Sequence, residues 1–328
     1  MIYQKVDGGH RNGWALTIES LTGLTLHRKI GGVQDLKSII SAKVFFDLSI
    51  EDGVISFFFI SLIRTLLRRK SIGIMLSPWD CYRPNKPSDK LRRFAFIMLK
   101  KLDHVKVICM IPFEMDARYK DIADDWIYDP EFWDMHAIEE RRSVIRNVSK
   151  SVKNAPTGKL SLLYLGSVSS EKGFEFLAKL FLENKNLFTK FELSIVGKIS
   201  KPYQYIAGQL REAGAHVVDE FVSDERMFSF IEKSSLMWCC YSQNYDASSG
   251  IFGRAIQFDK IPLLRSTSRL EKLAGLLGKH AVKFEFGNVD EALLKLNEID
   301  INSSSPNKEI NTYEMYCHAK EVIEQYIL

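Results

Sequence analysis

The chain has 328 residues, of which 46% are hydrophobic and 26% charged, and its formal net charge at pH 7 is +4. This length and composition are typical of a folded protein with two domains and argue against an intrinsically disordered chain. No apolar run approaches the roughly 20 residues that a spanning helix needs, and no secretory signal is evident, so we expect a cytoplasmic protein.

The first part of the chain alternates strand-like and helix-like segments, which is typical of a parallel sheet covered by helices. The longest apolar run, 54–63, ends at Arg64 and is interpreted as a buried helix. A polar segment with Pro156 and Gly158 predicts a linker at 153–158. Strands are expected at 1–6, 44–48, 72–76 and 105–110, and helices at 14–21, 54–67, 91–102 and 141–152.

The alternation resumes after the linker, with Ser223 as the expected N-cap of one helix. Strands are expected at 160–165, 191–196, 216–218, 236–241 and from 262, and helices at 174–182, 203–213, 224–232, 251–258 and 310–328. The sequence thus predicts an α/β protein with two doubly wound, Rossmann-like domains facing each other across a cleft. We expect a first domain at 1–155, a second at 156–308, and a C-terminal helix at 309–328 that returns to the first domain.

The cysteines indicate the redox state of the compartment, and the charge distribution indicates a candidate binding surface. The five cysteines show no CxxC spacing, which favours a reduced compartment with the thiols as small core residues. Segment 64–106 has twelve basic residues and three acidic ones, whereas 121–140 has eight acidic residues and no lysine or arginine. The basic segment predicts either contact with an anionic membrane surface or an ordinary solvated helix face. No nucleic-acid recognition motif accompanies it, so we expect no nucleic-acid partner.

The most informative segment is the loop 166–173, which follows the strand at 160–165. Gly166 and Ser167 end the strand, Lys172 and Gly173 precede a helix, and the loop between them is polar. Backbone N–H groups at a helix start together with one cation suit a phosphate group. The alternative is an ordinary strand–loop–helix turn with a solvated lysine.

A second loop, 246–255, has the same character. Ser248, Ser249 and the Gly250 amide stand at a helix start, where they can hydrogen-bond phosphate oxygens, and Asp246 and Arg254 flank them. An N-cap serine without a ligand is the alternative. Gly197, at the end of the strand 191–196, is expected at the same edge of the sheet. Because two loops of one domain are each suited to hold an anion, the pair favours a binding site.

These residues resemble the nucleotide-sugar-binding domain of family 4 glycosyltransferases, which have the GT-B fold. Gly166, Lys172 and Gly173 stand at the spacing of that family's first loop, with Ser167 where arginine is usual. Lys260-Ile261-Pro262-Leu263-Leu264 resembles the glycine-x-proline-valine-valine stretch that follows the family's donor helix. The resemblance covers about residues 160–300, and the order of elements extends it to the first domain.

The chain also departs from that pattern. The family usually has two glutamates eight positions apart around the donor helix, and here Ala247 and Ala255 occupy those positions. Asp246 lies next to the first of them and is a candidate substitute. Some relatives have a Ser-Ser-Gly pattern there, so inactivity does not follow.

The resemblance implies transfer of a sugar from a nucleotide-diphosphate sugar to a hydroxyl acceptor, without cofactor or metal and with retention. Lys172 would stabilise the leaving group, and the donor would contact Gly166, Ser167, Gly197, Asp246, Ser248, Ser249, Gly250 and Arg254. Gly8, Gly9, His10 and Trp79 would line the acceptor side, with His10 and Asp80 as further catalytic candidates. The acceptor would be a glycan or lipid-linked glycan of surface polysaccharide or glycolipid assembly, on the inner face of the plasma membrane. A catalytically silent scaffold and a nucleotide-sugar epimerase are the alternatives.

Overall fold

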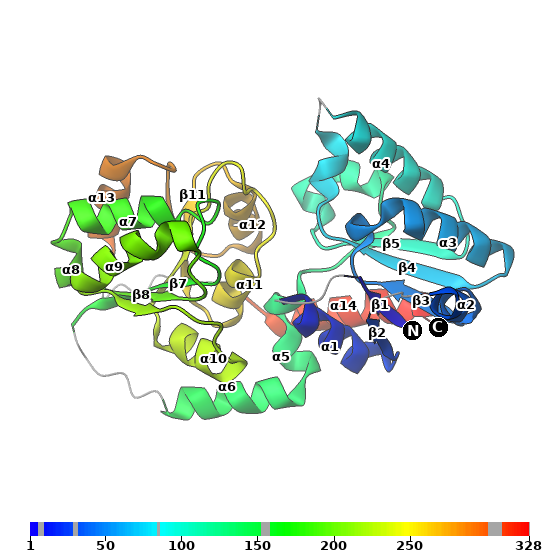
Figure 1. The fold of residues 1–328 in the computed structure, drawn as a ribbon, viewed down its shortest axis with the longest axis horizontal. Helices are drawn as coiled ribbons and strands as arrows, with labels where there is room; N and C mark the ends of the chain where they lie inside the picture. Colours follow the sequence, from blue (N-terminus) through cyan, green and yellow to red (C-terminus); the bar gives the residue numbers. More distant parts are fainter. Residues whose placement is uncertain (6–9, 29–31, 84–85, 152–157, 301–309, 328) are drawn as a thin grey trace. The chain divides into compact units, whose positions relative to one another are not determined.

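The computed structural model describes residues 1–5, 10–28, 32–83, 86–151, 158–300 and 310–327. The chain forms two compact units, one of residues 1–138 with 311–328 and one of residues 139–310 (Figure 1). The division lies before helix α6 (Glu139–Ser151), whereas the sequence placed it after residue 155. Helix α6 belongs to the second unit because it packs against helix α10 (Asp224–Lys233).

The first unit is built on a six-stranded parallel sheet in the order β2-β1-β3-β4-β5-β6. Its strands are β1 (Ile2–Gln4), β2 (Leu26–Arg28), β3 (Val44–Asp47), β4 (Lys70–Met75), β5 (Val105–Cys109) and β6 (Asp125–Trp126). Its helices are α1 (His10–Thr22), α2 (Val33–Ser41), α3 (Val54–Leu66), α4 (Pro87–Leu99), α5 (Asp134–Ala137) and α14 (Thr312–Ile327). The C-terminal helix α14 contacts β4 and β6, so it returns to this unit as the sequence predicted.

Strand β2 and helix α2 were not predicted, because 23–43 has neither a continuous apolar run nor a clear helical stripe. The strand has one half-buried and two exposed residues, and the helix buries only Ile39. Both elements form because they pair with or pack against neighbours, which a local pattern does not record.

The interpretation of 54–63 as a buried helix is wrong. Helix α3 buries Phe57, Ser61 and Arg64 and exposes Ile55 and Phe59. The Arg64 guanidinium donates to Ser71 Oγ at 3.0 Å and to the Ile40 carbonyl at 3.1 Å, so it satisfies backbone groups beneath the helix. Composition suggested a helix that is apolar on all sides, whereas the fold turns Ser61 and Arg64 inward.

The second unit is also built on a six-stranded parallel sheet, in the order β12-β11-β10-β7-β8-β9. Its strands are β7 (Leu160–Leu165), β8 (Phe191–Val196), β9 (His216–Val218), β10 (Leu236–Cys239), β11 (Ile261–Arg265) and β12 (Val282–Phe284). Its other helices are α7 (Phe174–Glu183), α8 (Leu187–Lys190), α9 (Gln204–Glu212), α11 (Gly250–Gln257), α12 (Arg269–Leu277) and α13 (Val289–Glu298). The fold class predicted from the sequence is confirmed, although α12, β12 and α13 were not predicted.

Local sequence explains the starts of several helices in this unit. Ser223 accepts a hydrogen bond from the Arg226 amide, as the sequence predicted, and Ser268 caps α12 in the same way.

The larger hydrophobic core of this unit lies between the sheet and its helices and includes Leu162, Phe174, Phe181 and Trp238. Four of the five cysteines are buried, and Cys317 is exposed. No helix within the described ranges combines the length and the hydropathy needed to cross a bilayer.

Candidate functional site

The candidate donor site lies where the strand order of the second sheet reverses. Strand β7 comes first in the unit and lies between β8 and β10, so the loops that leave β7 and β10 diverge at the carboxyl edge of the sheet. Such an edge is where open α/β sheets bind ligands. The structure therefore brings the two sequence-predicted loops, 166–173 and 246–255, to neighbouring strands of one sheet edge.

Two glycines allow the chain to come close to itself at this edge. Gly197 has φ +143°, and a Cβ there would lie 2.0 Å from the Gly166 carbonyl oxygen. Gly166 has φ +102°, and its amide donates to the Val196 carbonyl at 2.9 Å. The loops after β7 and β8 then run together, since the Val168 amide donates to the Lys198 carbonyl at 3.0 Å. Only glycine fits both the conformation and the approach at residue 197.

Lys172 is held at the base of the first loop. Its carbonyl accepts a hydrogen bond from Trp238 Nε1 at 3.1 Å, and its Nζ lies 5.8 Å from the centre of the Tyr241 ring. A Cβ on Gly166 would lie 3.5 Å from Lys172 Nζ, so the glycine leaves the ammonium group room. Burial lowers the pKa of Lys172, against a smaller opposing effect from Cys239. Among the residues that the structure describes, no carboxylate forms an ion pair with this lysine.

The second loop leads into helix α11. Ser249 is its N-cap: Oγ accepts from the Phe252 amide at 3.3 Å and shares a hydrogen bond with the Tyr241 hydroxyl at 2.9 Å. Ser248 is half-buried beside it, and Gly250 is the first helical residue. This cap uses the Phe252 amide, whereas the Gly250 and Ile251 amides have no acceptor within the helix, so they can donate to an anion.

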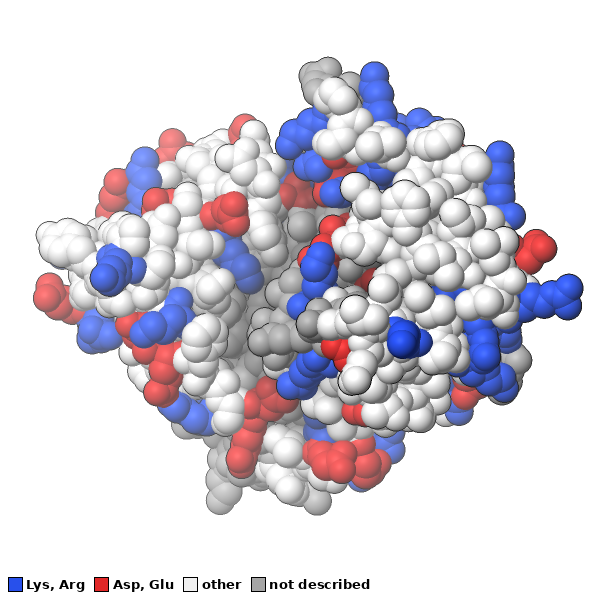
Figure 2. Space-filling model, turned by 45° about the vertical axis from the view of Figure 1, so that its right-hand side comes forward, with Lys and Arg blue, Asp and Glu red and all other residues white. Residues whose placement is uncertain are grey.

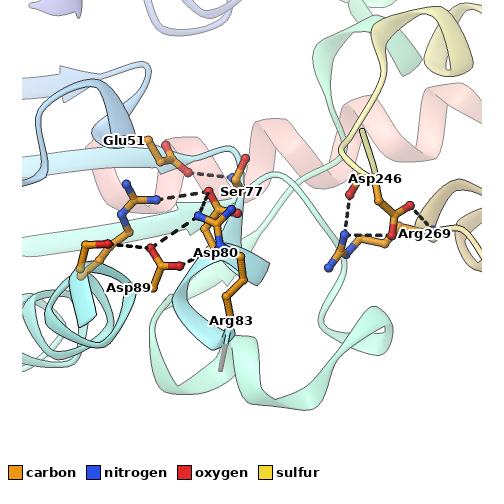
Figure 3. A network of polar contacts seen from close by, with 9 residues as sticks. Glu51, Ser77, Asp80, Arg83, Asp89, Asp246 and Arg269 are labelled. Carbon is orange, nitrogen blue, oxygen red and sulfur yellow. Dashed lines mark hydrogen bonds and ion pairs between the residues drawn. The ribbon is translucent and has the colours of Figure 1, made fainter. Parts of the chain in front are cut away.

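Asp246 is already engaged in ion pairs (Figure 3). Its carboxylate lies 2.9 Å from Arg265 Nη2 and 3.0 Å from Arg269 Nη1, and it accepts from the Arg269 amide at 2.9 Å. The aspartate thus fixes the second loop to the start of α12. We therefore leave it out of the donor contacts proposed below.

Arg254 points into the interior. It is 5% exposed, its Nη1 donates to Gln257 Oε1 at 2.6 Å, and its guanidinium lies 5.5 Å from the centre of the Phe228 ring. Ala255, where relatives have a glutamate, is fully buried. Both residues therefore contribute to the packing of α11.

An open pocket of about 310 Å³ lies beside these loops, at the carboxyl ends of β11 and β12. Its lining combines polar side chains with one aromatic ring: Gln243, Arg265, Ser266, Thr267, Glu285, Phe286 and Glu291. The sequence did not point to this pocket, because β12 itself was not predicted.

In the first unit, Asp80 lies in a charged network (Figure 3). It is part of a 3-10 turn, Pro78–Tyr82, that also contains the half-buried Trp79. Its Oδ2 lies 3.2 Å from Arg83 Nη2 and 3.3 Å from Arg92 Nη1, and Arg83 also binds Asp89 at 2.7 Å. Gly8 and Gly9 lie outside the described residues, and His10 begins helix α1.

Two carboxyl groups that the sequence did not single out lie at the carboxyl end of strand β3 and just after it. Asp47 ends the strand and accepts from the Ser49 amide at 3.0 Å, and Glu51 Oε1 accepts from the Ser77 amide at 2.7 Å. Burial raises the pKa of each to about 7. Glu51 Oε2 is buried without a partner among the described residues. Asp47 could have been found as an acidic residue directly after an apolar strand, whereas Glu51 carried no comparable signal.

These carboxyl groups predict a pH-dependent stability. Because each pKa is higher in the fold than in the unfolded chain, the protonated form favours folding, and stability falls as the pH rises from about 4 to about 7. We expect Asp47→Asn/Glu51→Gln to flatten this fall by roughly 6 kcal/mol, about 3 kcal/mol from each group. Urea unfolding between those pH values measures it, with the exposed Glu175→Gln as control. If the free energy of unfolding fell equally with pH in the double variant and in the original chain, the raised pKa values of Asp47 and Glu51 would be contradicted.

No group of three or more His, Cys, Asp or Glu side chains gathers to form a metal site in the part of the chain that the structure describes.

Comparison with known proteins gives structural relatives only. No family model and no curated protein matches the sequence. A Listeria monocytogenes protein assigned as a UDP-N-acetylglucosamine 2-epimerase matches with a TM-score of 0.56 at 11% identity, covering 99% of this chain and 97% of its own. A UDP-forming α,α-trehalose-phosphate synthase from Burkholderia xenovorans matches with a TM-score of 0.56 at 8% identity, covering 98% and 80%.

A third similar structure is a trehalose-6-phosphate synthase studied for glycosyl transfer with retention, with a TM-score of 0.53 at 9% identity, covering 95% and 83%. Identities this low show the fold alone, and assignment to family 4 stays a prediction. The two doubly wound parallel sheets and these likenesses together show that the chain has the GT-B fold of nucleotide-sugar glycosyltransferases.

Proposed function

We propose that the protein is a glycosyltransferase that moves a sugar from a nucleotide-diphosphate sugar to a hydroxyl acceptor. The observation that carries this proposal is the placement of Lys172 and the start of helix α11 after adjacent strands of one sheet edge. A half-buried ammonium group without a carboxylate partner, together with helix-start amides, suits a diphosphate.

In the proposed reaction the bond between the sugar's anomeric carbon and the diphosphate oxygen breaks, the acceptor oxygen bonds to that carbon, and the proton of the acceptor hydroxyl passes to the departing diphosphate. Negative charge then grows on the diphosphate. Lys172 would neutralise it, and Ser248 and the Gly250 amide would donate hydrogen bonds to it. Because Lys172 sits in a partly desolvated position, its charge acts through a lower effective dielectric than in water.

We propose a uridine diphosphate donor and transfer with retention, on the strength of the trehalose-phosphate synthase likenesses. The acceptor would be a glycan or lipid-linked glycan in surface polysaccharide or glycolipid assembly. Asp47 and Glu51 join Asp80 as candidates to contact the acceptor, because their carboxyl groups lie at the sheet edge of the first unit and titrate near pH 7.

Two other functions have specific support. The likeness to the Listeria protein favours a nucleotide-sugar epimerase, which would change the sugar without any acceptor. Ala247 and Ala255, in place of the usual glutamates, favour a scaffold that binds a nucleotide without turnover.

A thermal-shift screen against UDP, GDP, ADP, CMP and their sugar conjugates tests the donor site. A ligand that binds only the folded state raises the free energy of unfolding, by about 2.7 kcal/mol at 100 times its Kd. We expect UDP or a UDP sugar to stabilise the protein, and Lys172→Ala to remove the effect. The exposed Lys179→Ala is the control. No shift with any of these ligands would contradict the proposal, and an acceptor-independent change of UDP-N-acetylglucosamine would favour the epimerase.

A further inference from the structure

Helix α3 buries two polar side chains, Ser61 and Arg64, and exposes a row of large apolar ones. Its buried side is formed by Phe57, Ser61 and Arg64. At 100° per residue, the opposite side is formed by residues that are 38–80% exposed: Ile55, Phe59, Leu62 and Leu66. A helix that places an arginine inside and a row of large apolar side chains outside is suited to an apolar environment on its outer side.

Helix α4 continues this apolar surface. It contacts α3. Helix α3 connects β3 to β4 and helix α4 connects β4 to β5, and because these parallel strands are neighbours in that order, right-handed crossovers place both helices on the same face of the sheet. Its outward stripe consists of Leu91, Phe94 and Met98, which are 64%, 60% and 37% exposed. The seven outward residues of the two helices form what we call the α3/α4 face. Exposed apolar surfaces of this kind mark interaction sites.

Basic residues border the α3/α4 face. Lys90 and Lys101 lie beside the Phe94 stripe, and Arg68 follows the end of α3. Each is exposed, and none forms an ion pair with a described residue. The one acidic residue of the two helices, Asp89, is buried and bound to Arg83. Figure 2 shows a white, uncharged area on this unit whose edges carry mainly lysines and arginines and some acidic side chains.

The structure narrows the set of basic residues in segment 64–106 that could contact an anionic surface. Arg64 is buried, and Arg92 and Arg93 form ion pairs with Asp80 and Asp121, so these three arginines are not available to an anionic surface. Arg68, Lys90 and Lys101, which border the α3/α4 face, remain available.

We propose that the α3/α4 face is a membrane-binding surface, which lies on an anionic lipid bilayer. Apolar side chains on two adjacent helices enter the boundary between head groups and acyl chains, and the bordering cations attract anionic lipids. A bilayer fits better than a protein partner, because the face has a border of unpaired positive charge and no exposed carboxylate among the described residues of the two helices. This inference does not depend on the proposed sugar transfer.

Cosedimentation of the full chain with vesicles tests the proposal without any sugar substrate. We expect binding to vesicles of phosphatidylcholine with phosphatidylglycerol, weak binding to phosphatidylcholine alone, and loss of binding as salt rises. Phe59→Ser/Phe94→Ser and Lys90→Glu/Lys101→Glu are each expected to lower the partition coefficient at least tenfold.

The matched controls lie in the second unit. Phe221→Ser/Leu294→Ser removes apolar side chains that are 84% and 58% exposed, and Lys179→Glu/Lys233→Glu reverses two exposed lysines. Both controls should bind vesicles like the original chain, and circular dichroism checks that every variant folds. Absent vesicle binding, or binding unchanged in the α3/α4 variants, would overturn the proposal. A dimer that Phe59→Ser/Phe94→Ser dissociates, without lipid binding, would assign the face to a second copy of the chain instead.

Discussion

Replacement of Lys172 by alanine is expected to lower the turnover of the nucleotide-sugar donor by roughly 10²–10³-fold, the usual cost of removing one group that stabilises developing charge. The fold should survive, because the contact of Lys172 with Trp238 uses its backbone carbonyl, and no described carboxylate depends on its ammonium group. Release of UDP from a UDP sugar, measured with saturating acceptor, gives the comparison.

The control is Lys179→Ala, which removes an exposed lysine from the neighbouring helix α7 and should leave turnover unchanged. Lys172→Arg keeps the charge but needs more room near Gly166, so we expect an intermediate loss. Full turnover in Lys172→Ala, with an unchanged melting temperature, would exclude the leaving-group role. If Lys172→Ala bound UDP as tightly as the original chain, the diphosphate would have to bind away from Lys172.

The second large effect is expected from Gly197→Ala. The new Cβ would lie 2.0 Å from the Gly166 oxygen and 2.6 Å from its carbonyl carbon, and both belong to backbone that cannot rotate away. The strained φ and the overpacking together should cost roughly 3 kcal/mol or more of unfolding free energy. The loop 166–173 should shift at the same time, so UDP binding should weaken.

Gly208→Ala provides the matched control, because a Cβ there meets nothing within 4 Å. This glycine lies inside helix α9, where alanine is favoured by about 1 kcal/mol. Urea denaturation should therefore show opposite signs for the two Gly→Ala changes. Equal stability of Gly197→Ala and the original chain would mean that the loops after β7 and β8 do not approach as closely as described.

The sequence by itself determined the layered α/β architecture and much of its second unit. Leu160–Leu165 is mostly apolar, Phe191–Val196 alternates apolar and polar residues in its first half, and each segment ends at a glycine, so period and length identify both as strands. Gly166, Lys172 and Ser249 could also be placed at strand and helix ends, because loops at the carboxyl edge of a parallel sheet follow from the alternation alone. Likewise, Ser223 marked the start of a helix through local capping chemistry.

Only the tertiary structure decided which way side chains face and which of them are already paired. Arg64 is basic and the run before it apolar, yet the arginine is inside and Phe59 outside. Asp246 and Arg254 stand in the second loop as plausible ligands, but Asp246 pairs with Arg265 of strand β11 and Arg254 lies over the Phe228 ring of helix α10. Glu51 gains its raised pKa from burial alone. The physical reason is the same in each case: burial and pairing depend on residues distant in the sequence, whereas periodicity and capping act between near neighbours.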